Sequence, residues 1–336
     1  MTDIELEKVW SELPSPSPAE LSGIRVPGLP LHAPVYVVVD ASRRRQFLVA
    51  IAEGVEPPKK SSTRGLDISA EDLAIGGSPV RRYIRLLCHD PAHYPTFTAL
   101  CSSIVTAILA DPNEPKAAVV RCLERWRSFW TVDQTALTRE QALGLFGELW
   151  FLYRWMGPLS LVNLTRWQGP LGSRHDFQWP AASVEIKAAA SNSGTSPVHF
   201  VGSLDQLENP EEGQLFLFSL HVADDNLAAN SLPVLVERIS SDTASNLEFG
   251  SLFSERLAKA GYNPAESGRY SRPFRILSEE LYLVDHAFPR LTRATFQPSL
   301  PSGIGDVSYH LSMNACAQWR IASAPTDPAA VALRQA

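Results

Sequence analysis

Cysteine is scarce in this 336-residue chain, and none of its four cysteines has the CxxC spacing or the neighbouring histidine pair of a zinc site. They are Cys88, Cys101, Cys122 and Cys316. A reduced, unliganded cysteine behaves as a small apolar residue, so we expect all four in the core of a protein from a reducing compartment. The chain also shows no internal repeat.

Long apolar runs are absent as well, so no segment is expected to cross a membrane. The first ten residues are acidic and mixed, which is unlike the basic and then apolar pattern of a signal peptide. Together these absences predict a cytoplasmic protein without a membrane anchor.

Excess positive charge is missing too: 30 Lys and Arg against 36 Asp and Glu give a net charge of −6. Because Lys and Arg supply phosphate contacts, this balance argues mildly against a protein that grips DNA unaided. Arginines do cluster in the N-terminal third, where they are candidates for DNA backbone contact, although a solvated face is the usual explanation. They are Arg43, Arg44, Arg45, Arg81, Arg82, Arg121, Arg125 and Arg127.

The length and the apolar content of 45% allow two domains. Residues 1–135 are predicted to form an N-terminal β-rich domain that also contains helices. We expect this domain to contact DNA or a partner. Its expected strands lie at 35–40, 46–52, 66–68 and 83–88, the first two as a hairpin, and its helices at 94–109 and 116–130. The Pro- and Ser-rich residues 13–18 are not expected to form a regular element.

Residues 136–322 are predicted to form a core of mixed strands and helices. The whole chain is therefore expected to be an α/β (α+β) protein. A capping-box pattern at Thr138 and Gln141 marks the start of a helix that ends before Gly157. Further strands are expected at 175–179, 183–189, 215–222, 281–284 and 308–312, and helices at 203–208, 232–240 and 252–260. The Ala- and Pro-rich residues 323–336 are expected to be a flexible tail.

The most informative stretch is 184–187, where apolar and charged residues alternate so that Glu185 and Lys187 share one face of a strand. Both residue types are poor strand formers and are seldom buried without a reason. Asp176 lies just upstream, beside a candidate strand. An Asp and a Glu on neighbouring strands can share one divalent cation, with the lysine ammonium beside it, which is typical of phosphodiester cleavage.

Each residue alone has an ordinary explanation. Asp176 suits a turn, and Glu185 with Lys187 could be a surface ion pair. Gln206 could hold the metal site or contact a phosphate, or be an ordinary helix-surface glutamine. His175 and His199 are more often structural than metal ligands. The occurrence of all the acidic and basic residues in one order on suitable elements favours a site.

Glu148 is the most informative carboxylate outside the strands. Its helix neighbours three and four residues away include Leu145, Phe151 and Leu152, so it is expected within the apolar face. A charge there needs a cation or a strong hydrogen-bond donor. The alternative is a glutamate at the helix end that reaches solvent or pairs with Arg154.

Five motifs carry a resemblance: Gly-Leu-Phe-Gly-Glu-Leu at 144–149, Trp-Gln-Gly-Pro at 167–170, His-Asp-Phe at 175–177, Val-Glu-Ile-Lys at 184–187 and Ser-Leu-Asp-Gln-Leu at 203–207. Weaker landmarks follow at 261–262, 286–290 and 303–309. The chain resembles, over nearly its whole length, the bacterial PD-(D/E)XK motif protein family of the restriction-endonuclease-like superfamily. One departure is His175, which stands where the motif's name puts proline.

The resemblance implies a central mixed sheet flanked by helices and the use of Mg²⁺, for which Mn²⁺ can substitute. By matched position, Asp176 and Glu185 would be metal ligands, Lys187 the catalytic lysine and Glu148 an auxiliary acid that completes a second metal site or holds a water. The backbone carbonyl of Ile186, between Glu185 and Lys187, is a further candidate ligand. One-metal and two-metal mechanisms both stay open.

The expected function is therefore a Mg²⁺-dependent DNA endonuclease, the cleavage subunit of a multi-protein bacterial anti-phage or restriction-modification system. The resemblance implies DNA, a helicase-like ATPase, a MutL/MORC-type ATPase and a DNA methyltransferase as partners. A double-strand cut needs two active sites or two visits, so a homo-oligomer is also an expectation. The alternatives are a non-catalytic DNA-binding or scaffolding subunit on a nuclease fold and, third, a structural protein with a buried ion network.

Overall fold

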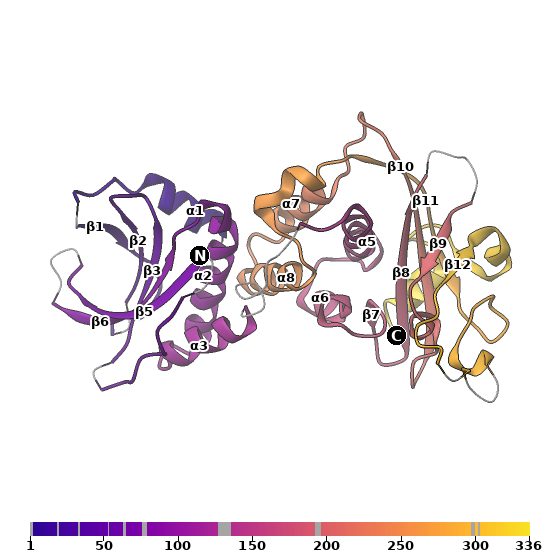
Figure 1. Ribbon diagram of the computed structural model, residues 1–336, viewed down its shortest axis with the longest axis horizontal. Coiled ribbons are helices and arrows are strands. Elements are labelled where there is room, and N and C mark those ends of the chain that lie inside the picture. Colours follow the sequence, from indigo (N-terminus) through magenta and orange to yellow (C-terminus); the bar gives the residue numbers. More distant parts are fainter. Residues whose placement is uncertain are drawn as a thin grey trace. The chain divides into compact units, whose positions relative to one another are not determined.

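The computed structural model describes residues 3–18, 20–32, 34–52, 54–62, 65–75, 79–126, 136–191, 196–296, 300–301 and 303–336. The chain forms two compact units (Figure 1). Unit 1 contains Met1–Ala136 and Thr243–Glu266, and unit 2 contains Leu137–Asp242 and Ser267–Ala336. The sequence-based division assigned 243–266 to the core instead, because a helical pattern does not reveal which unit the helix packs against.

Unit 1 is built on a six-stranded antiparallel sheet in the order β1-β2-β3-β6-β5-β4. Its strands are β1 (Leu21–Arg25), β2 (Val35–Asp40), β3 (Arg45–Ala50), β4 (Ser61–Ser62), β5 (Leu66–Leu73) and β6 (Arg81–Cys88). The expected hairpin is confirmed as the pair β2 and β3. Runs of Val, Phe and Leu in these two strands suit a sheet that buries apolar side chains.

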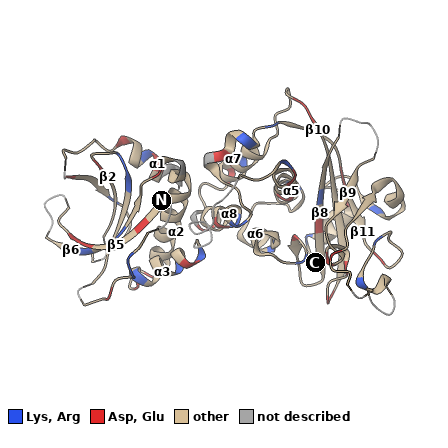
Figure 2. Ribbon diagram, viewed as in Figure 1, with Lys and Arg blue, Asp and Glu red and all other residues tan. Residues whose placement is uncertain are grey.

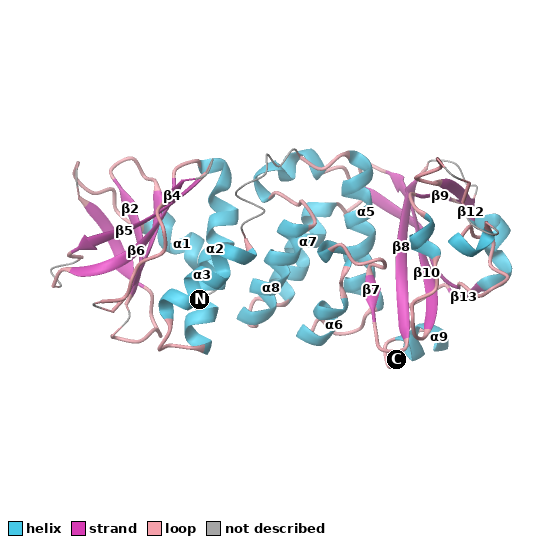
Figure 3. Cartoon of the chain, turned by 60° about the horizontal axis from the view of Figure 1, so that its bottom comes forward, coloured by secondary structure: helices cyan, strands magenta, loops and turns pink. Residues whose placement is uncertain are grey.

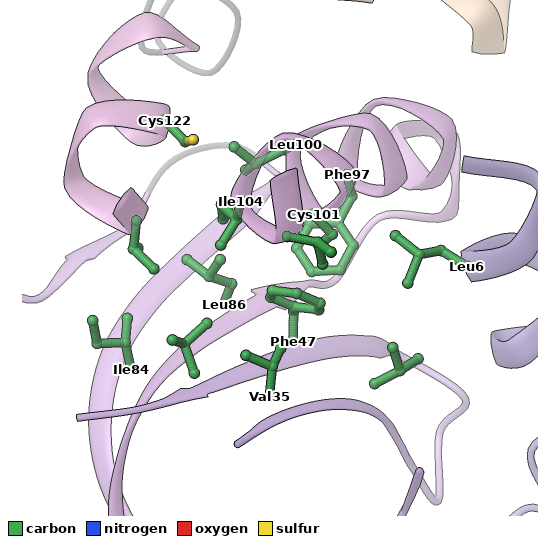
Figure 4. Packing of buried hydrophobic residues seen from close by; sticks show 14 of the residues in the cluster. Leu6, Val35, Phe47, Ile84, Leu86, Phe97, Leu100, Cys101, Ile104 and Cys122 are labelled. Atoms are coloured by element: carbon green, nitrogen blue, oxygen red, sulfur yellow. The ribbon is translucent and has the colours of Figure 1, made fainter. Parts of the chain in front are cut away.

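One face of this sheet is covered by helices α1 (Asp3–Glu12), α2 (Tyr94–Ala110) and α3 (Pro115–Arg125), with a 3₁₀ turn η1 (Pro91–His93) before α2, and α8 (Leu247–Lys259) packs on α2. Phe47 and Leu86 of the sheet pack toward Phe97 and Leu100 of α2 in one core (Figure 4). The sequence did not predict α1, whose Leu6 is fully buried in this core. The expected helix at 116–130 is confirmed as far as Arg125, and residues 127–135 lie outside the described ones.

The arginines of unit 1 are largely engaged within the unit. Arg44 lies 2.8 Å from Asp40, Arg45 lies 2.6 Å from Glu7, Arg82 lies 3.2 Å from Asp72, Arg125 lies 3.4 Å from Glu255, and Arg43 donates to the carbonyl of Trp10 at 3.2 Å. Figure 2 shows basic and acidic residues interspersed over these elements. Arg127 lies outside the described residues. These pairings favour the ordinary explanation of the arginine clusters.

Unit 2 is built on a five-stranded mixed sheet in the order β13-β11-β10-β8-β7. The strands are β7 (Phe177–Gln178), β8 (Ala182–Ala190), β10 (Gln214–Asp224), β11 (Phe274–Leu283) and β13 (Arg320–Ala322). Strands β8 and β10 are parallel, and the other neighbours are antiparallel. The expected α/β (α+β) class, with a central mixed sheet flanked by helices, is confirmed (Figure 3).

One face of this sheet carries α5 (Arg139–Trp150), which begins with the expected capping box at Thr138 and continues as a π-helical turn η2 (Phe151–Trp155). The helix crosses close to β8 at Gly147. A Cβ there would lie 3.0 Å from the Cβ of Ala188 and 3.3 Å from a methyl carbon of Ile186. Glycine at 147 therefore allows the close approach that brings Glu148 to the sheet. Two more helices in this unit are α6 (Leu161–Arg166) and α7 (Leu232–Asp242).

The opposite face carries a two-stranded ribbon of β9 (Val198–Val201) and β12 (Tyr309–Ser312). The core beneath the ribbon includes Leu215 and Leu217 of β10. Since Leu217 is in register with Glu185, and neighbours in register point to the same face, Glu185 and Lys187 face this side. Short 3₁₀ turns in this unit are η3 (Gly169–Leu171), η4 (Leu204–Leu207), η6 (Arg293–Thr295) and η7 (Met313–Trp319). Along the chain, η5 (Pro264–Tyr270) includes the last residues of unit 1 and the first residues with which the chain returns to unit 2.

The C-terminal residues differ from the expected flexible tail. Residues 328–333 form helix α9 (Pro328–Leu333), and its Ala330 and Leu333 are buried. Arg334 anchors the end of this helix, because its Nε donates to the carbonyl of Trp155 at 2.6 Å. Alanine is a strong helix former, which suits the sequence of α9.

Candidate active site

The site lies where β7 begins, beside β8. Phe177 is paired with Val184, and β8 runs on to Ala190. Asp176 comes just before β7, and its side chain takes over from the strand: Oδ2 accepts a hydrogen bond of 2.7 Å from the backbone N–H of Ile186. A carboxylate thus continues the ladder beyond the first residue of the neighbouring strand.

The carbonyl of Ile186 faces the same region. In an extended strand, the N–H and the C=O of one residue point to the same side, and the N–H of Ile186 points to Asp176. The next residue along the chain on either side, Glu185 or Lys187, belongs to the face away from α5. The Asp176 carboxylate and the Ile186 carbonyl therefore lie at one edge of β8, and Glu185 is near enough for the charge of Asp176 to raise its pKa.

Lys187 points at the carboxylate beside it. Its Nζ lies 3.0 Å from Oε1 of Glu185 and 2.9 Å from Oε1 of Gln206. The Gln206 oxygen also accepts a bond of 2.8 Å from the N–H of Gly202, which fixes the amide. Gln206 thus contacts the lysine, a partner that the sequence did not suggest for it.

Glu148 approaches from α5 and is not paired with Arg154, which instead lies 2.7 Å from Glu279. Oε2 of Glu148 accepts a short hydrogen bond of 2.6 Å from the indole N–H of Trp167. A Cβ built on Gly169 would lie 2.8 Å from this oxygen and 2.8 Å from Oδ1 of Asp176. The two carboxylate oxygens are thus no more than twice that distance apart, and Gly169 borders the gap between them.

Burial dominates the electrostatics of the three carboxylates. Burial and then the charge of Asp176 raise the pKa of Glu185 while Lys187 lowers it, and the result is a pKa of about 8. Burial raises the pKa of Asp176 to about 6, against the Ile186 hydrogen bond and Lys187. Burial, and then Asp176, raises the pKa of Glu148 well above its usual range, while the Trp167 bond lowers it. Three acids, of which Glu185 is buried and Glu148 and Asp176 are partly buried, share one ammonium, an imbalance that a divalent cation would offset.

The donor set fits a hard cation, because two carboxylates and a carbonyl supply oxygens and Mg²⁺ keeps several waters of its own. Within the described part of the chain, however, no three His, Cys, Asp or Glu side chains are grouped closely enough to hold one metal ion together. The prediction does not require such a set, because it assigns two carboxylates to the cation and Glu148 to a water or a second ion. Lys187 lies 3.0 Å from an oxygen of Glu185, and Trp167 donates to one of Glu148 at 2.6 Å.

Both nearby histidines fit the structural explanation. His175 Nε2 lies 3.0 Å from the carbonyl of Glu208, and burial lowers the pKa of His175 to about 4. His199 Nε2 lies 2.7 Å from Oγ of Ser219, and burial, with Lys187 nearby, lowers the pKa of His199 to about 3. Each is thus neutral near pH 7. The four cysteines are buried and unpaired by disulfides, as expected.

Trp167 and Gly169 were landmarks of the resemblance without a role. The Trp-Gln-Gly-Pro stretch was the available signal, but a tryptophan in a sequence does not show which group its N–H will contact.

None of the described helices is both long enough and apolar enough to cross a membrane.

A mixed sheet with an aspartate before one strand, Glu-x-Lys on the next and a helix glutamate beside them is the arrangement expected of the PD-(D/E)XK class. A family model described as "Putative PD-(D/E)XK family member, (DUF4420)" matches residues 6–314. The chain belongs to this family, and the resemblance drawn from the motifs is confirmed. Comparisons with curated proteins and with solved structures gave no match.

Proposed function

We propose that this chain is a Mg²⁺-dependent DNA endonuclease, the cleavage subunit of a cytoplasmic, multi-protein bacterial anti-phage or restriction system. The observation that supports it best is the convergence of Asp176, Glu185 and Lys187, with Glu148 alongside, at the edge of β8. A solvated surface pair would not account for this, because Glu185 is only 2% exposed. Buried groups of charged residues with perturbed pKa values are concentrated at functional sites.

In this proposal, Asp176, Glu185 and the Ile186 carbonyl hold the cation, and Glu148 holds a water or contributes to a second ion. Mg²⁺ held there, or Mn²⁺ in its place, would supply Lewis acidity toward the scissile phosphate and toward the attacking water. Lys187 orients the attacking water, or neutralises charge that develops on the phosphate in the transition state. Gln206 keeps the lysine in place through its amide oxygen.

The test is cleavage of modified and unmodified plasmid with Mg²⁺ or Mn²⁺, with and without the products of neighbouring genes. Asp176→Ala and Lys187→Ala should each abolish cutting while thermal unfolding shows a folded protein. Asp225→Ala is a matched control, because Asp225 forms a surface ion pair with Arg275 at 3.1 Å in the same unit. Cleavage that is unchanged in both site variants would refute the proposal.

A second candidate is a non-catalytic DNA-binding or scaffolding subunit. The net charge of −6 and the internal pairing of the arginines in unit 1 favour dependence on partners for DNA contact. The proposed partners are a helicase-like ATPase, a MutL/MORC-type ATPase and a DNA methyltransferase, with a second copy of the chain for double-strand cuts. A complex that forms with these proteins and binds DNA, yet never cuts with any metal, would support this candidate.

A further inference from the structure

The segment that follows α6 is joined to both acidic residues flanking the gap. Trp167 is fully buried and bridges to Phe177 of β7. The N–H groups of Gln168 and Gly169 both donate to the carbonyl of Asp176, at 2.7 and 3.0 Å. The Trp167 indole donates to Glu148 at 2.6 Å. Residues 167–169 thus hold the backbone of one acid and the side chain of the other.

Gly169 is not needed for a left-handed backbone, unlike Gly172, whose φ is +76°. What position 169 requires is room. An added Cβ would come within 2.8 Å of an oxygen of Glu148 and of an oxygen of Asp176, closer than real Cβ contacts. Any side chain there would displace the two carboxylates or fill the space between them.

We infer that Trp167 and Gly169 are positioning residues of the proposed metal site: the indole fixes the Glu148 carboxylate, and the bare Cα keeps open the gap between Glu148 and Asp176 for a cation or its water. This inference rests on the proposed function. Neither residue touches the reacting groups, so each acts through the two acids.

The chemistry of the indole suits this task. An indole N–H is a donor only, so it orients a carboxylate without competing for the cation or supplying a titrating proton. The indole N–H lies 2.6 Å from Oε2 of Glu148, a short hydrogen bond that fixes where this oxygen lies. Groups that orient metal ligands in this way typically account for about 10- to 100-fold in metal affinity.

Calorimetric titration with Mg²⁺ tests both residues. Trp167→Phe keeps an aromatic ring but removes the donor, and Gly169→Ala adds only the intruding methyl. Each should weaken Mg²⁺ binding by about 10- to 100-fold. Both variants are checked by thermal unfolding, so that weakened binding is compared only between folded proteins.

Two matched controls separate these effects from the substitutions themselves. Trp319→Phe removes an indole that donates to Asp285 at 3.0 Å, a similar bond elsewhere in unit 2. Gly144→Ala adds a methyl on α5 where nothing lies within 4 Å. Both controls should bind Mg²⁺ with wild-type affinity.

A spectroscopic measurement covers the case in which Trp167→Phe does not fold. In protein labelled with ¹⁵N-tryptophan, Glu148→Gln should move one indole N–H signal far more than the others, and Mg²⁺ should move that same signal in the wild type. A purely structural tryptophan would not respond to the ion. If no indole N–H signal shifts either in Glu148→Gln or on addition of Mg²⁺, the proposed role of Trp167 is wrong.

Parallel plasmid cleavage distinguishes the possible failures. If the wild type binds Mg²⁺ and cuts, but Trp167→Phe and Gly169→Ala bind equally well, the inference fails and the nuclease assignment stands. If only one variant binds weakly, the other residue loses its assigned role. If the wild type neither binds Mg²⁺ nor cuts DNA alone or with its partners, the proposed function fails, and the positioning role fails with it.

Discussion

The carboxylate of Asp176 is bonded to the backbone of Ile186, with Oδ2 accepting the N–H at 2.7 Å. Asp176 is therefore attached to β8, the strand that carries Glu185 and Lys187, through a backbone N–H. Substitution of the Glu185 or Lys187 side chain does not remove that N–H. The same bond lowers the pKa of Asp176, yet burial outweighs it and the pKa is still raised to about 6. Asp176 combines a structural task with the proposed ligand task, and the two can be separated.

Asp176→Asn and Asp176→Ala make that separation. Asparagine retains an oxygen that can accept the Ile186 N–H and carries no buried charge, so at pH 8 the Asn variant should be at least as stable as the wild type. Alanine leaves a buried N–H without its partner, which costs about 1–3 kcal/mol relative to Asn. Both should lose cleavage. Urea unfolding measures the stabilities, and an Ala variant as stable as Asn would show that the bond has no structural weight.

Lys187 should be needed for catalysis and Glu185 for metal binding, although their side chains lie 3.0 Å apart. Lys187→Ala is expected to abolish cutting and leave Mg²⁺ affinity largely intact, since an ammonium is not a metal ligand. Glu185→Ala should weaken Mg²⁺ binding itself, because it removes a proposed ligand. Titration of both variants with Mg²⁺ or Mn²⁺ makes the comparison. Equal affinities in the two variants would contradict this division.

The acids also predict how pH affects the metal-free protein. The pKa of Glu185 is raised from 4.5 to about 8, so its proton stabilises the fold fully below about pH 4.5, and that stabilisation is lost as the pH rises through about 8. The loss is on the order of a few kcal/mol for a buried group. Mg²⁺ competes with this proton, so Mg²⁺ should bind more tightly at pH 8 than at pH 6.

Thermal unfolding from pH 5 to pH 9, with and without Mg²⁺, measures both effects. The wild type without metal should lose stability across this range relative to Glu185→Gln, which cannot release that proton. Mg²⁺ should raise the melting temperature more at pH 8 than at pH 6. Parallel pH curves for the wild type and the Gln variant would show that Glu185 is already ionised in the metal-free fold.

Local patterns predicted a good part of this site. Alternation at 184–187 placed Glu185 and Lys187 on one face, and the capping box at Thr138 fixed where the helix of Glu148 begins. Partners set by long-range packing were beyond such patterns. The Trp167 indole meets a residue 19 positions away, and the strand before β8 has two residues because the Asp176 side chain takes the next hydrogen bond.

Glu279 of β11 predicts a stability effect away from the site. It accepts the indole N–H groups of Trp150 at 2.7 Å and Trp155 at 2.9 Å, and it pairs with Arg154 at 2.7 Å. Burial pushes the pKa of Glu279 up, but these donors outweigh it and hold the pKa below its usual range. Glu279→Ala leaves two indole donors without this acceptor, so it should cost about 2–4 kcal/mol at pH 7.

Because the pKa of Glu279 is lowered, its contribution is present above pH 4.5 and is lost as the pH falls through the lowered value. The difference between wild type and Glu279→Ala should therefore shrink in acid. Urea unfolding at pH 7 and pH 4 measures it, with Glu237→Ala on the exposed face of α7 as the control. A difference of the same size at both pH values would mean that the loss is one of packing and not of charge.

The last prediction concerns α8, which the chain adds to unit 1 after passing through part of unit 2. Ser251 of α8 lies 2.8 Å from Ser103 of α2, Oγ to Oγ, and Glu255 lies 3.4 Å from Arg125 of α3. Ala258 packs against the core of the unit. A fragment of residues 1–136 lacks this helix and exposes the buried face of α2, so it should fold poorly or aggregate.

Joining residues 243–266 to that fragment through a flexible glycine–serine linker should restore a cooperative thermal transition, followed by circular dichroism. A linked variant with Glu255→Ala and Ala258→Asp removes the ion pair and places a charge against the core, so it should unfold at a lower temperature than the linked parent. If residues 1–136 alone melt cooperatively at the same temperature as the linked protein, α8 contributes nothing to unit 1. The N-terminal unit would then be a self-sufficient domain, as the sequence-based division at residue 135 supposes.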